Sequence, residues 1–173
     1  HQDVHSFPTR RSSDLNLAAY ASLQTAHDLS KYESGRGSVN FNSASDPEWS
    51  KAMIQCIDIR NAGIEGPGTI DGRHVENKRG EEHMRGPHTI LIVNGEKLRF
   101  KNFQVTRSAN YAILAYDIRD CKFNRLTINE GWDGIHIRGC EQVEISHCKM
   151  HTGDDAIAGG RSEERRVGKE CTS

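Results

Sequence analysis

The sequence predicts an all-β protein built as a parallel β-helix, a solenoid in which each coil has about 22 residues. Short apolar segments recur at a constant spacing in its second half. Apolar and polar residues alternate within several of these segments, and glycines separate them, a pattern typical of short strands joined by turns. The 173 residues suggest at most one domain.

Composition excludes several classes of partner. The formal net charge is -1, which gives no argument for a nucleic-acid partner. No stretch approaches the roughly 20 apolar residues that a membrane helix needs, so no membrane span is expected. Five cysteines occur without a CxxC spacing, so neither a zinc site nor a redox motif is expected, and we interpret them as free, buried thiols.

The two ends of the chain do not resemble natural protein sequence. His5–Leu15 (HSFPTRRSSDL) and Arg161–Cys171 (RSEERRVGKEC) are similar to translations of one sequencing adapter read in its two directions. Such segments are excluded from fold reasoning, as tags are. We therefore expect residues 1–15 and 161–173 to be non-native and residues 16–160 to be a partial β-helix domain, cut at both ends.

The first part of the domain has the weakest pattern. Apolar residues at every third position between Leu17 and Ala26 are compatible with a weak helix or with a loose lead-in segment. Residues 34–46 are rich in Gly, Ser and Asn, which predicts a loop. The motif GPGTIDG at 66–72 predicts tight turns around one short strand, Thr69–Asp71. The charged stretch 73–87 is interpreted as an exposed excursion.

A repeat begins near Thr89. Four apolar segments start 22 residues apart, at Ile90, Ala112, Gly134 and Ala156. In a β-helix, equivalent positions of successive coils stack into ladders because each coil buries its inner face against its neighbours. The spacing predicts one apolar ladder of Leu91, Ile113, Ile135 and Ile157, and a second that includes Phe103, Cys121 and Cys148. The spaced leucines of a leucine-rich repeat are absent.

Three acidic residues fall on this register. Asp133 and Asp155 are 22 residues apart, so they should occupy the same place on adjacent coils, about 4.8 Å apart, with Asp154 beside them. A single Asp in a repeat is best explained as a turn residue. Three stacked carboxylates repel one another, so their convergence favours a functional site.

Several motifs together resemble a known family. GPGTIDG at 66–72, WDGIHIRGCEQVEI at 132–145 and TGDDAIA at 152–158 are similar to glycoside hydrolase family 28, the polygalacturonase-like enzymes. The resemblance covers roughly residues 54–160. It implies a right-handed parallel β-helix that hydrolyses pectic α-linked galacturonan or rhamnogalacturonan with inversion. It also implies an extracellular or periplasmic, monomeric protein with a polysaccharide substrate and no metal or other cofactor.

The resemblance assigns roles to individual residues. Asp154 would be the general acid, and Asp133 and Asp155 would together hold and deprotonate the attacking water. The family's Asn-Thr-Asp motif falls on residues 131–133, where the Asp alone is kept. Trp132 could stack on a sugar ring or simply pack. His136 and Arg138 should face outward, where they could contact an acidic sugar or be ordinary exposed strand residues.

The family's later Gly-His-Gly and Arg-Ile-Lys motifs, which bind and orient the sugar acid, are expected beyond Gly160 and are absent from this sequence. The 173-residue chain is therefore expected to be inactive by itself. Two other interpretations stay open. One is a pectate-lyase-like eliminase with Ca²⁺ held by the three Asp residues. The other is a non-catalytic β-helix, such as a binding or adhesin module.

Overall fold

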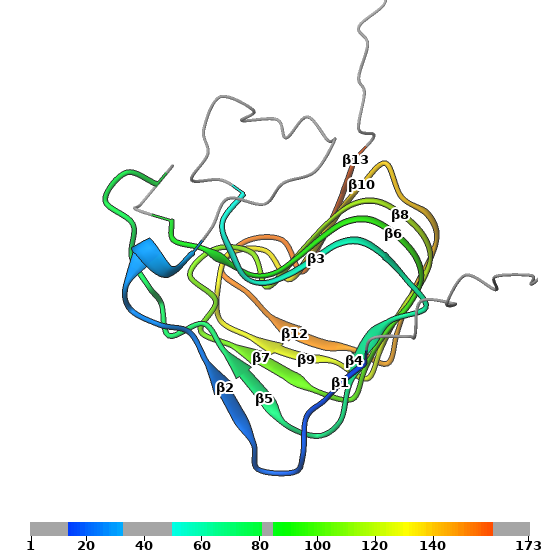
Figure 1. Cartoon of the computed structure of the whole chain (residues 1–173), viewed down its shortest axis with the longest axis horizontal. Coiled ribbons are helices and arrows are strands. Elements are labelled where there is room, and N and C mark those ends of the chain that lie inside the picture. Colours follow the sequence, from blue (N-terminus) through cyan, green and yellow to red (C-terminus); the bar gives the residue numbers. More distant parts are fainter. Residues whose placement is uncertain (1–13, 33–49, 81–84, 161–173) are drawn as a thin grey trace, which may run out of the picture.

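The computed structural model describes residues 14–32, 50–80 and 85–160, and almost every regular element in these ranges is a β-strand (Figure 1). In chain order the elements are β1 (Asp14–Asn16), β2 (Ser22–Gln24), the 3-10 helix η1 (Leu29–Lys31), β3 (Ala52–Arg60), β4 (Gly63–Glu65), β5 (Thr69–Asp71), β6 (His88–Lys101), β7 (Gln104–Thr106), β8 (Ile113–Asn124), β9 (Thr127–Asn129), β10 (Ile135–Arg138), β11 (Glu141–Ser146), β12 (Lys149–His151) and β13 (Ile157–Gly160).

The strands form the coils of a parallel β-helix, as the sequence predicts. All strand pairs are parallel, and the strands of one sheet follow the order β1-β4-β6-β8-β10-β13, with β3 pairing with β6 and β11 with β8. A second sheet has the order β12-β9-β7-β5-β2. Each coil thus runs through one sheet, turns, and returns through the other, with the strands of neighbouring coils stacked (Figure 1).

Three faces result from a bend in the longest strands. The first halves of β3, β6 and β8 form face 1 with β10 and β13. The second halves of β6 and β8 form face 2 with β1, β4 and β11, and the second sheet forms face 3. The bend is made by residues with positive φ, including Asp58, Asn94 and Asp117, at 53°, 51° and 49°. Asp and Asn tolerate this left-handed backbone better than most residues, which explains their recurrence here.

The coil length differs from the prediction at one step. Ile90 pairs with Ile113, 23 residues later, whereas Ile113 pairs with Ile135 and Ile135 with Ile157 at the predicted 22. The prediction that Leu91 joins this ladder is therefore wrong, and Ile90 takes its place. A shift of one residue moves a side chain to the other side of a strand.

The second predicted ladder is also only partly correct. Cys121 pairs with Leu98 and Val143 on face 2. Phe103 precedes β7, and the register of β7, β9 and β12 places it in line with Leu126 and Cys148. Phe103, Cys121 and Cys148 are 18 and 27 residues apart, which differs from the coil length, and Cys121 therefore lies on a different face from the other two.

The structure differs from the predictions for residues 17–26 and for the excursion at 73–87. The helical interpretation of residues 17–26 is wrong, because Ser22–Gln24 is a strand that pairs with Thr69–Asp71, whose own prediction as a strand is confirmed. Asp14 and Leu15 belong to β1, which pairs with β4. The predicted loop at 34–46 lies outside the described residues. The excursion is not fully exposed, since Val75 is 2% exposed and its carbonyl lies against Gly86.

The β6 and β8 strands of face 1 are apolar on both sides. Ile90, Ile92, Ile113 and Ile135 point into the lumen of the β-helix, where they join the main core. Leu91, Val93 and Leu114 lie on the outer side with Tyr111 and Tyr116. A strand that is buried on both sides has a continuous run of apolar residues, which explains the segment Ile-Leu-Ile-Val at 90–93.

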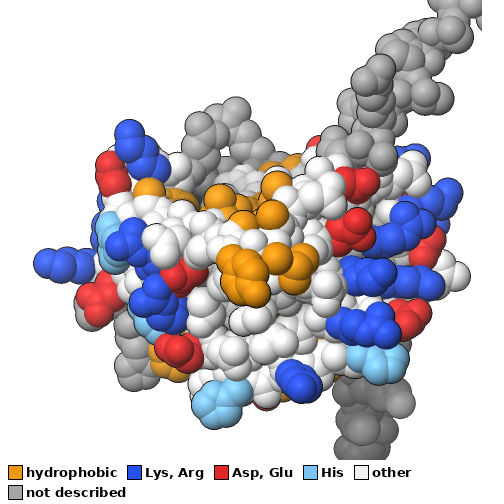
Figure 2. Space-filling view, turned by 90° about the horizontal axis from the view of Figure 1, so that it is seen from below, with side chains coloured by type: hydrophobic (Ala, Val, Ile, Leu, Met, Phe, Trp, Pro, Cys, Tyr) orange, Lys and Arg blue, Asp and Glu red, His pale blue; other side chains and the backbone are white. Residues whose placement is uncertain are grey.

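Face 2 carries several charged side chains. Ion pairs join neighbouring coils on face 2 between Arg119 and Glu141, at 2.9 Å, and between Lys122 and Glu144, at 3.6 Å. Figure 2 shows charges of both signs gathered at two sides of one face, around a middle with few charges. Within the described ranges, no helix has the length and apolar character needed to cross a membrane.

Candidate active site

The predicted catalytic residues lie on the turns that lead from face 3 to face 1. These turns span residues 107–112, 130–134 and 152–156 in consecutive coils. The amide of Ala112 donates to the carbonyl of Asp133, and the amide of Gly134 donates to the carbonyl of Asp155, both at 2.9 Å. Asp133 and Asp155 therefore occupy the same position of adjacent coils, and Asp154, whose amide donates to the Trp132 carbonyl at 3.1 Å, precedes the second.

The three carboxylates differ in their environments. Asp133 is 4% exposed, whereas Asp154 and Asp155 are both exposed. Gly131 lies in the turn that carries Asp133 and has a φ of +94°, and a Cβ at this position would lie 2.9 Å from the Cβ of Ser108. The glycine that replaces the family's Asn at this position thus fits a backbone conformation and a spacing that other residues would strain.

Asp133 contacts His136 of β10, which in turn contacts Arg138 of the same strand. Its Oδ2 lies 2.7 Å from Nδ1 of His136, and Nε of Arg138 donates to Nε2 of His136 at 3.0 Å. The ring of Tyr111 stacks on His136, with centroids 4.9 Å apart and an interplanar angle of 9°. His136 and Arg138 lie on the outer side of face 1, as predicted, but His136 is 9% exposed because Tyr111 covers it, so the alternative of an ordinary exposed position is wrong for this residue.

Trp132 lies beside this group on the surface. The guanidinium of Arg85 lies over its ring, 4.3 Å from the centroid, and is 5.9 Å from the centroid of Tyr111. Trp132 also packs against the outer apolar cluster of face 1. Burial raises the pKa of the Tyr111 hydroxyl, and the nearby charge of Asp133 raises it further. The sequence contains no signal for the roles of Arg85 and Tyr111, because each comes from a different coil.

A cavity of about 400 Å³ opens next to these turns. Its walls come from the excursion after β5 and from all three turns, and include His74, Ser108, Ala109, Gly131, Trp132 and Gly153. A larger cavity of about 480 Å³ lies at the bend between faces 1 and 2, lined by residues such as Asp58, Asn94 and Asp117, and holds none of the predicted site residues. Of the predicted site residues, Trp132 lines the smaller cavity, whereas the three aspartates lie on the same turns without lining it.

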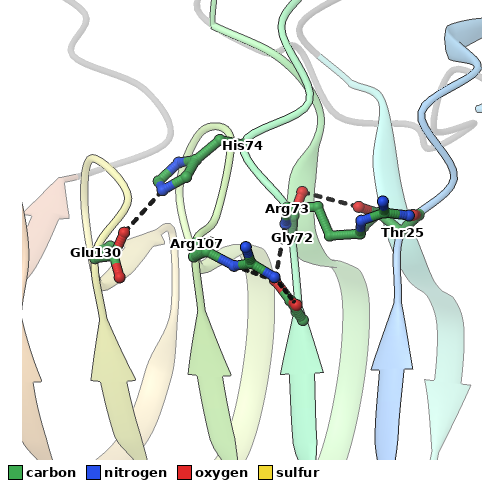
Figure 3. A network of polar contacts seen from close by, with 7 residues as sticks. Thr25, Gly72, Arg73, His74, Arg107 and Glu130 are labelled. Carbon is green, nitrogen blue, oxygen red and sulfur yellow. Dashed lines mark hydrogen bonds and ion pairs between the residues drawn. The ribbon is translucent and has the colours of Figure 1, made fainter.

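A polar network lies where the strands of face 3 end and these turns begin (Figure 3). Asp71, at the end of β5, accepts hydrogen bonds from the Arg107 side chain and from the Arg73 amide. Nε2 of His74 lies 2.8 Å from a carboxylate oxygen of Glu130, which precedes Gly131. Burial acts to raise the pKa of Asp71, but the hydrogen bonds from Arg107 and Arg73 outweigh it and hold that pKa below its ordinary value.

The same network reaches the first coil. Oγ1 of Thr25 donates to the Gly72 carbonyl at 2.8 Å. The network thus ties together the ends of β2, β5, β7 and β9, strands of four coils. In the part of the chain that the structure describes, no group of three or more His, Cys, Asp or Glu side chains is arranged to hold a metal ion.

The fold and this turn region define a parallel β-helix with aspartates stacked at one edge of a sheet. A sequence profile described as Glycosyl hydrolases family 28 matches residues 22–168. The chain belongs to this family, which confirms the resemblance seen in its motifs.

Individual relatives are distant and longer. An endo-polygalacturonase of Pectobacterium carotovorum subsp. carotovorum is 26% identical over 140 residues, covering 67% of this chain and 35% of that protein. The polygalacturonase QRT2 of Arabidopsis thaliana is 23% identical over 145 residues, covering 76% and 33%. The chain thus spans about a third of the length of these curated relatives.

Solved structures show the same fold. The polygalacturonase from Erwinia carotovora ssp. carotovora superposes with a TM-score of 0.67 at 19% identity, covering 87% of this chain and 46% of that one. The family 28 exopolygalacturonase of Yersinia enterocolitica gives a TM-score of 0.66 at 18% identity, covering 86% and 36%. At these identities the likeness establishes the fold, and the chemistry must be argued from the site.

Proposed function

We propose that the whole protein hydrolyses the α-glycosidic bonds of a pectic polysaccharide, galacturonan or rhamnogalacturonan-like, with inversion at the anomeric carbon. Membership of family 28 and the polygalacturonases among its relatives support this class of substrate. The observation that carries the proposal is the stacking of Asp133 and Asp155 at one position of adjacent coils, with Asp154 beside them and a cavity next to the turns.

The mechanism divides the carboxylates into two roles. Asp154, which is exposed, would donate its proton to the glycosidic oxygen as the bond from that oxygen to the anomeric carbon breaks. Asp133 and Asp155 would orient a water molecule and take its proton as its oxygen bonds to the opposite side of the anomeric carbon. Inverting hydrolysis needs acid and base about 6.5–9.5 Å apart so that this water fits between them.

Positive and aromatic groups near the turns suit an acidic sugar. Arg138 is partly exposed and could pair with the carboxylate of a uronate. Trp132, with the Arg85 guanidinium over one face, offers an aromatic surface beside the cavity. We propose Trp132, His136 and Arg138 as substrate-side residues, with His136 acting through Asp133. Action on a polymer outside the cell fits an extracellular or periplasmic protein that works as a monomer.

The experiment measures hydrolysis of polygalacturonate and rhamnogalacturonan by the whole protein, with product stereochemistry followed by proton NMR. The Asp154→Asn variant should lose roughly 100- to 10,000-fold in kcat, because it removes the general acid. Asp117→Asn changes a carboxylate in the other cavity and should leave kcat unchanged.

Two results would overturn the proposal. One is an Asp154→Asn variant with wild-type kcat. The other is an unsaturated product that absorbs in the ultraviolet and whose formation stops when a chelator is added, since a calcium-dependent eliminase behaves in this way.

A further inference from the structure

We propose that His136 is a positioning residue that holds Asp133 as an ionised proton acceptor, and that Arg138 sets the tautomer of His136 that makes this possible. The inference rests on the proposed function where it assigns Asp133 to water activation. The arrangement of the three side chains does not depend on it.

The direction of the hydrogen bonds follows from what each atom can do. The Nε–H of a guanidinium can donate but never accept, so Nε2 of His136 must be the acceptor in its 3.0 Å contact with Arg138. A neutral imidazole has one N–H, which must then lie on Nδ1. Nδ1–H therefore donates to Oδ2 of Asp133 at 2.7 Å. The Asp133 carboxylate is therefore the acceptor in this contact, and its Oδ2 is held in place by the imidazole.

Packing prevents the imidazole from adopting another arrangement. His136 is 9% exposed, and the Tyr111 ring lies nearly parallel to it at 4.9 Å. Tyr111 is held in turn, since its amide donates to Nδ1 of His88 at 3.3 Å and Arg85 lies over its ring. The charged and titratable groups around His136 are thus Asp133 and Arg138 in direct contact, with Tyr111, His88 and Arg85 behind them.

This arrangement separates the roles of the three aspartates. Asp133 is buried and has one oxygen committed to His136, so its orientation is fixed, and Oδ1 is the oxygen that can take a proton from water. His136 cannot relay that proton, because Nδ1 already carries a hydrogen and Nε2 already accepts a hydrogen bond from Arg138. The proton stays on Asp133 until the product leaves, and the general acid must be one of the two exposed aspartates of the next turn.

The first test is spectroscopic and needs no catalysis. The 173-residue chain, labelled with ¹⁵N-histidine, is examined by long-range proton–nitrogen correlation, with His136→Asn used to assign the signal. The hydrogen of the His136 ring should be found on Nδ1, with none on Nε2. A hydrogen on Nε2 would overturn the inference.

The variant Arg138→Met tests what sets the tautomer. Arg138 is partly exposed, so its loss should leave the fold intact, while Nε2 is released from its role as an acceptor. The correlation spectrum should then show a share of rings with the hydrogen on Nε2, a form absent from the wild type. If wild type and Arg138→Met show the same tautomer, Arg138 does not set it.

The second test is kinetic and uses the whole protein. His136→Leu should lower kcat about 10- to 100-fold with little change in KM, as removal of a supporting hydrogen-bond partner does. His136→Asn places an amide N–H near the position of Nδ1–H and should recover most of the lost kcat. Equal losses in both variants would show a role in packing alone and would overturn the positioning role.

Failure of the inference and failure of the proposed function can be told apart. If the whole protein hydrolyses pectic polymers but His136 carries its hydrogen on Nε2, the proposed function stands and the inference is wrong. If no hydrolysis occurs but His136 carries its hydrogen on Nδ1, the proposed function is wrong and the hydrogen-bond arrangement stands.

Discussion

Asp133 and Asp155 occupy the same position in consecutive coils and have opposite environments. Asp133 has a described turn on each side, 107–112 and 152–156, and is 4% exposed. Asp155 is exposed, and its described neighbour is the turn that carries Asp133. Burial in a solenoid is therefore supplied by the adjacent coils and not by the coil itself.

The same contrast holds inside the lumen. Ile135 and Ile157 are paired residues of one ladder with the same side chain, and they are 0% and 51% exposed. β10 has a described strand on each side, β8 and β13, whereas the described partner of β13 is β10, so the difference reflects the contribution of a neighbouring coil. Three comparisons of matched variants follow from this contrast, in decreasing order of expected effect.

The largest effect is expected in the ladder. Ile135→Ala leaves a cavity between two coils and should lower the free energy of unfolding by about 2–5 kcal/mol. Ile157→Ala removes a side chain that is half exposed and should cost clearly less. Urea unfolding followed by circular dichroism measures both. Equal costs would show that Ile157 is as fully buried in solution as Ile135.

A smaller, pH-dependent effect is expected at Asp71, which has Arg107 on the neighbouring coil. Asp71→Asn weakens this pair and should cost about 1–2 kcal/mol near neutral pH, because solvent around the half-exposed Arg107 screens the interaction. The exposed Asp155→Asn is the control and should change stability by less than about 0.5 kcal/mol.

The sign of the pH effect at Asp71 follows from its pKa. That pKa is lower in the folded chain than its ordinary value of 3.8, so the stabilisation is complete above 3.8 and is lost as the pH falls toward the lowered pKa. The difference between wild type and Asp71→Asn should shrink over this acidic range. A difference that stays constant down to pH 2 would contradict the ion pair.

The smallest effect compares the two stacked aspartates directly. Asp133→Asn replaces an ionised acceptor of the His136 bond with a neutral one and should cost about 1 kcal/mol. Asp155→Asn has no buried partner to lose among the described residues, so its melting temperature should match wild type. Differential scanning calorimetry of the two variants is the measurement, and a larger loss for Asp155→Asn would reverse the comparison.

Much of the fold could be predicted from the residues because the repeat is local in the sequence. The strand Thr69–Asp71 was bounded by glycines, and the spacing from Asp133 to Asp155 predicted their stacking. The 23-residue coil after Ile90 could not be predicted, since one extra residue in a turn leaves no mark on the strands around it. For this reason the 22-residue spacing predicts Leu91 in the lumen, whereas it lies on the outer side of face 1.

The sequence by itself determined the class of fold, the family and the position of the three aspartates along the coil. Period, turn residues and ordered motifs are properties of the chain that persist whatever surrounds it. The tertiary structure decided which aspartate is buried, that His136 lies between Asp133 and Arg138, and that Tyr111 and Arg85 cover this group. Tyr111 and Arg85 come from other coils than His136, and contacts between coils have no fixed spacing in a sequence. Asp133, His136 and Arg138 belong to one coil, but their contacts depend on the direction of the turn and on side-chain rotamers, which the residue pattern does not show.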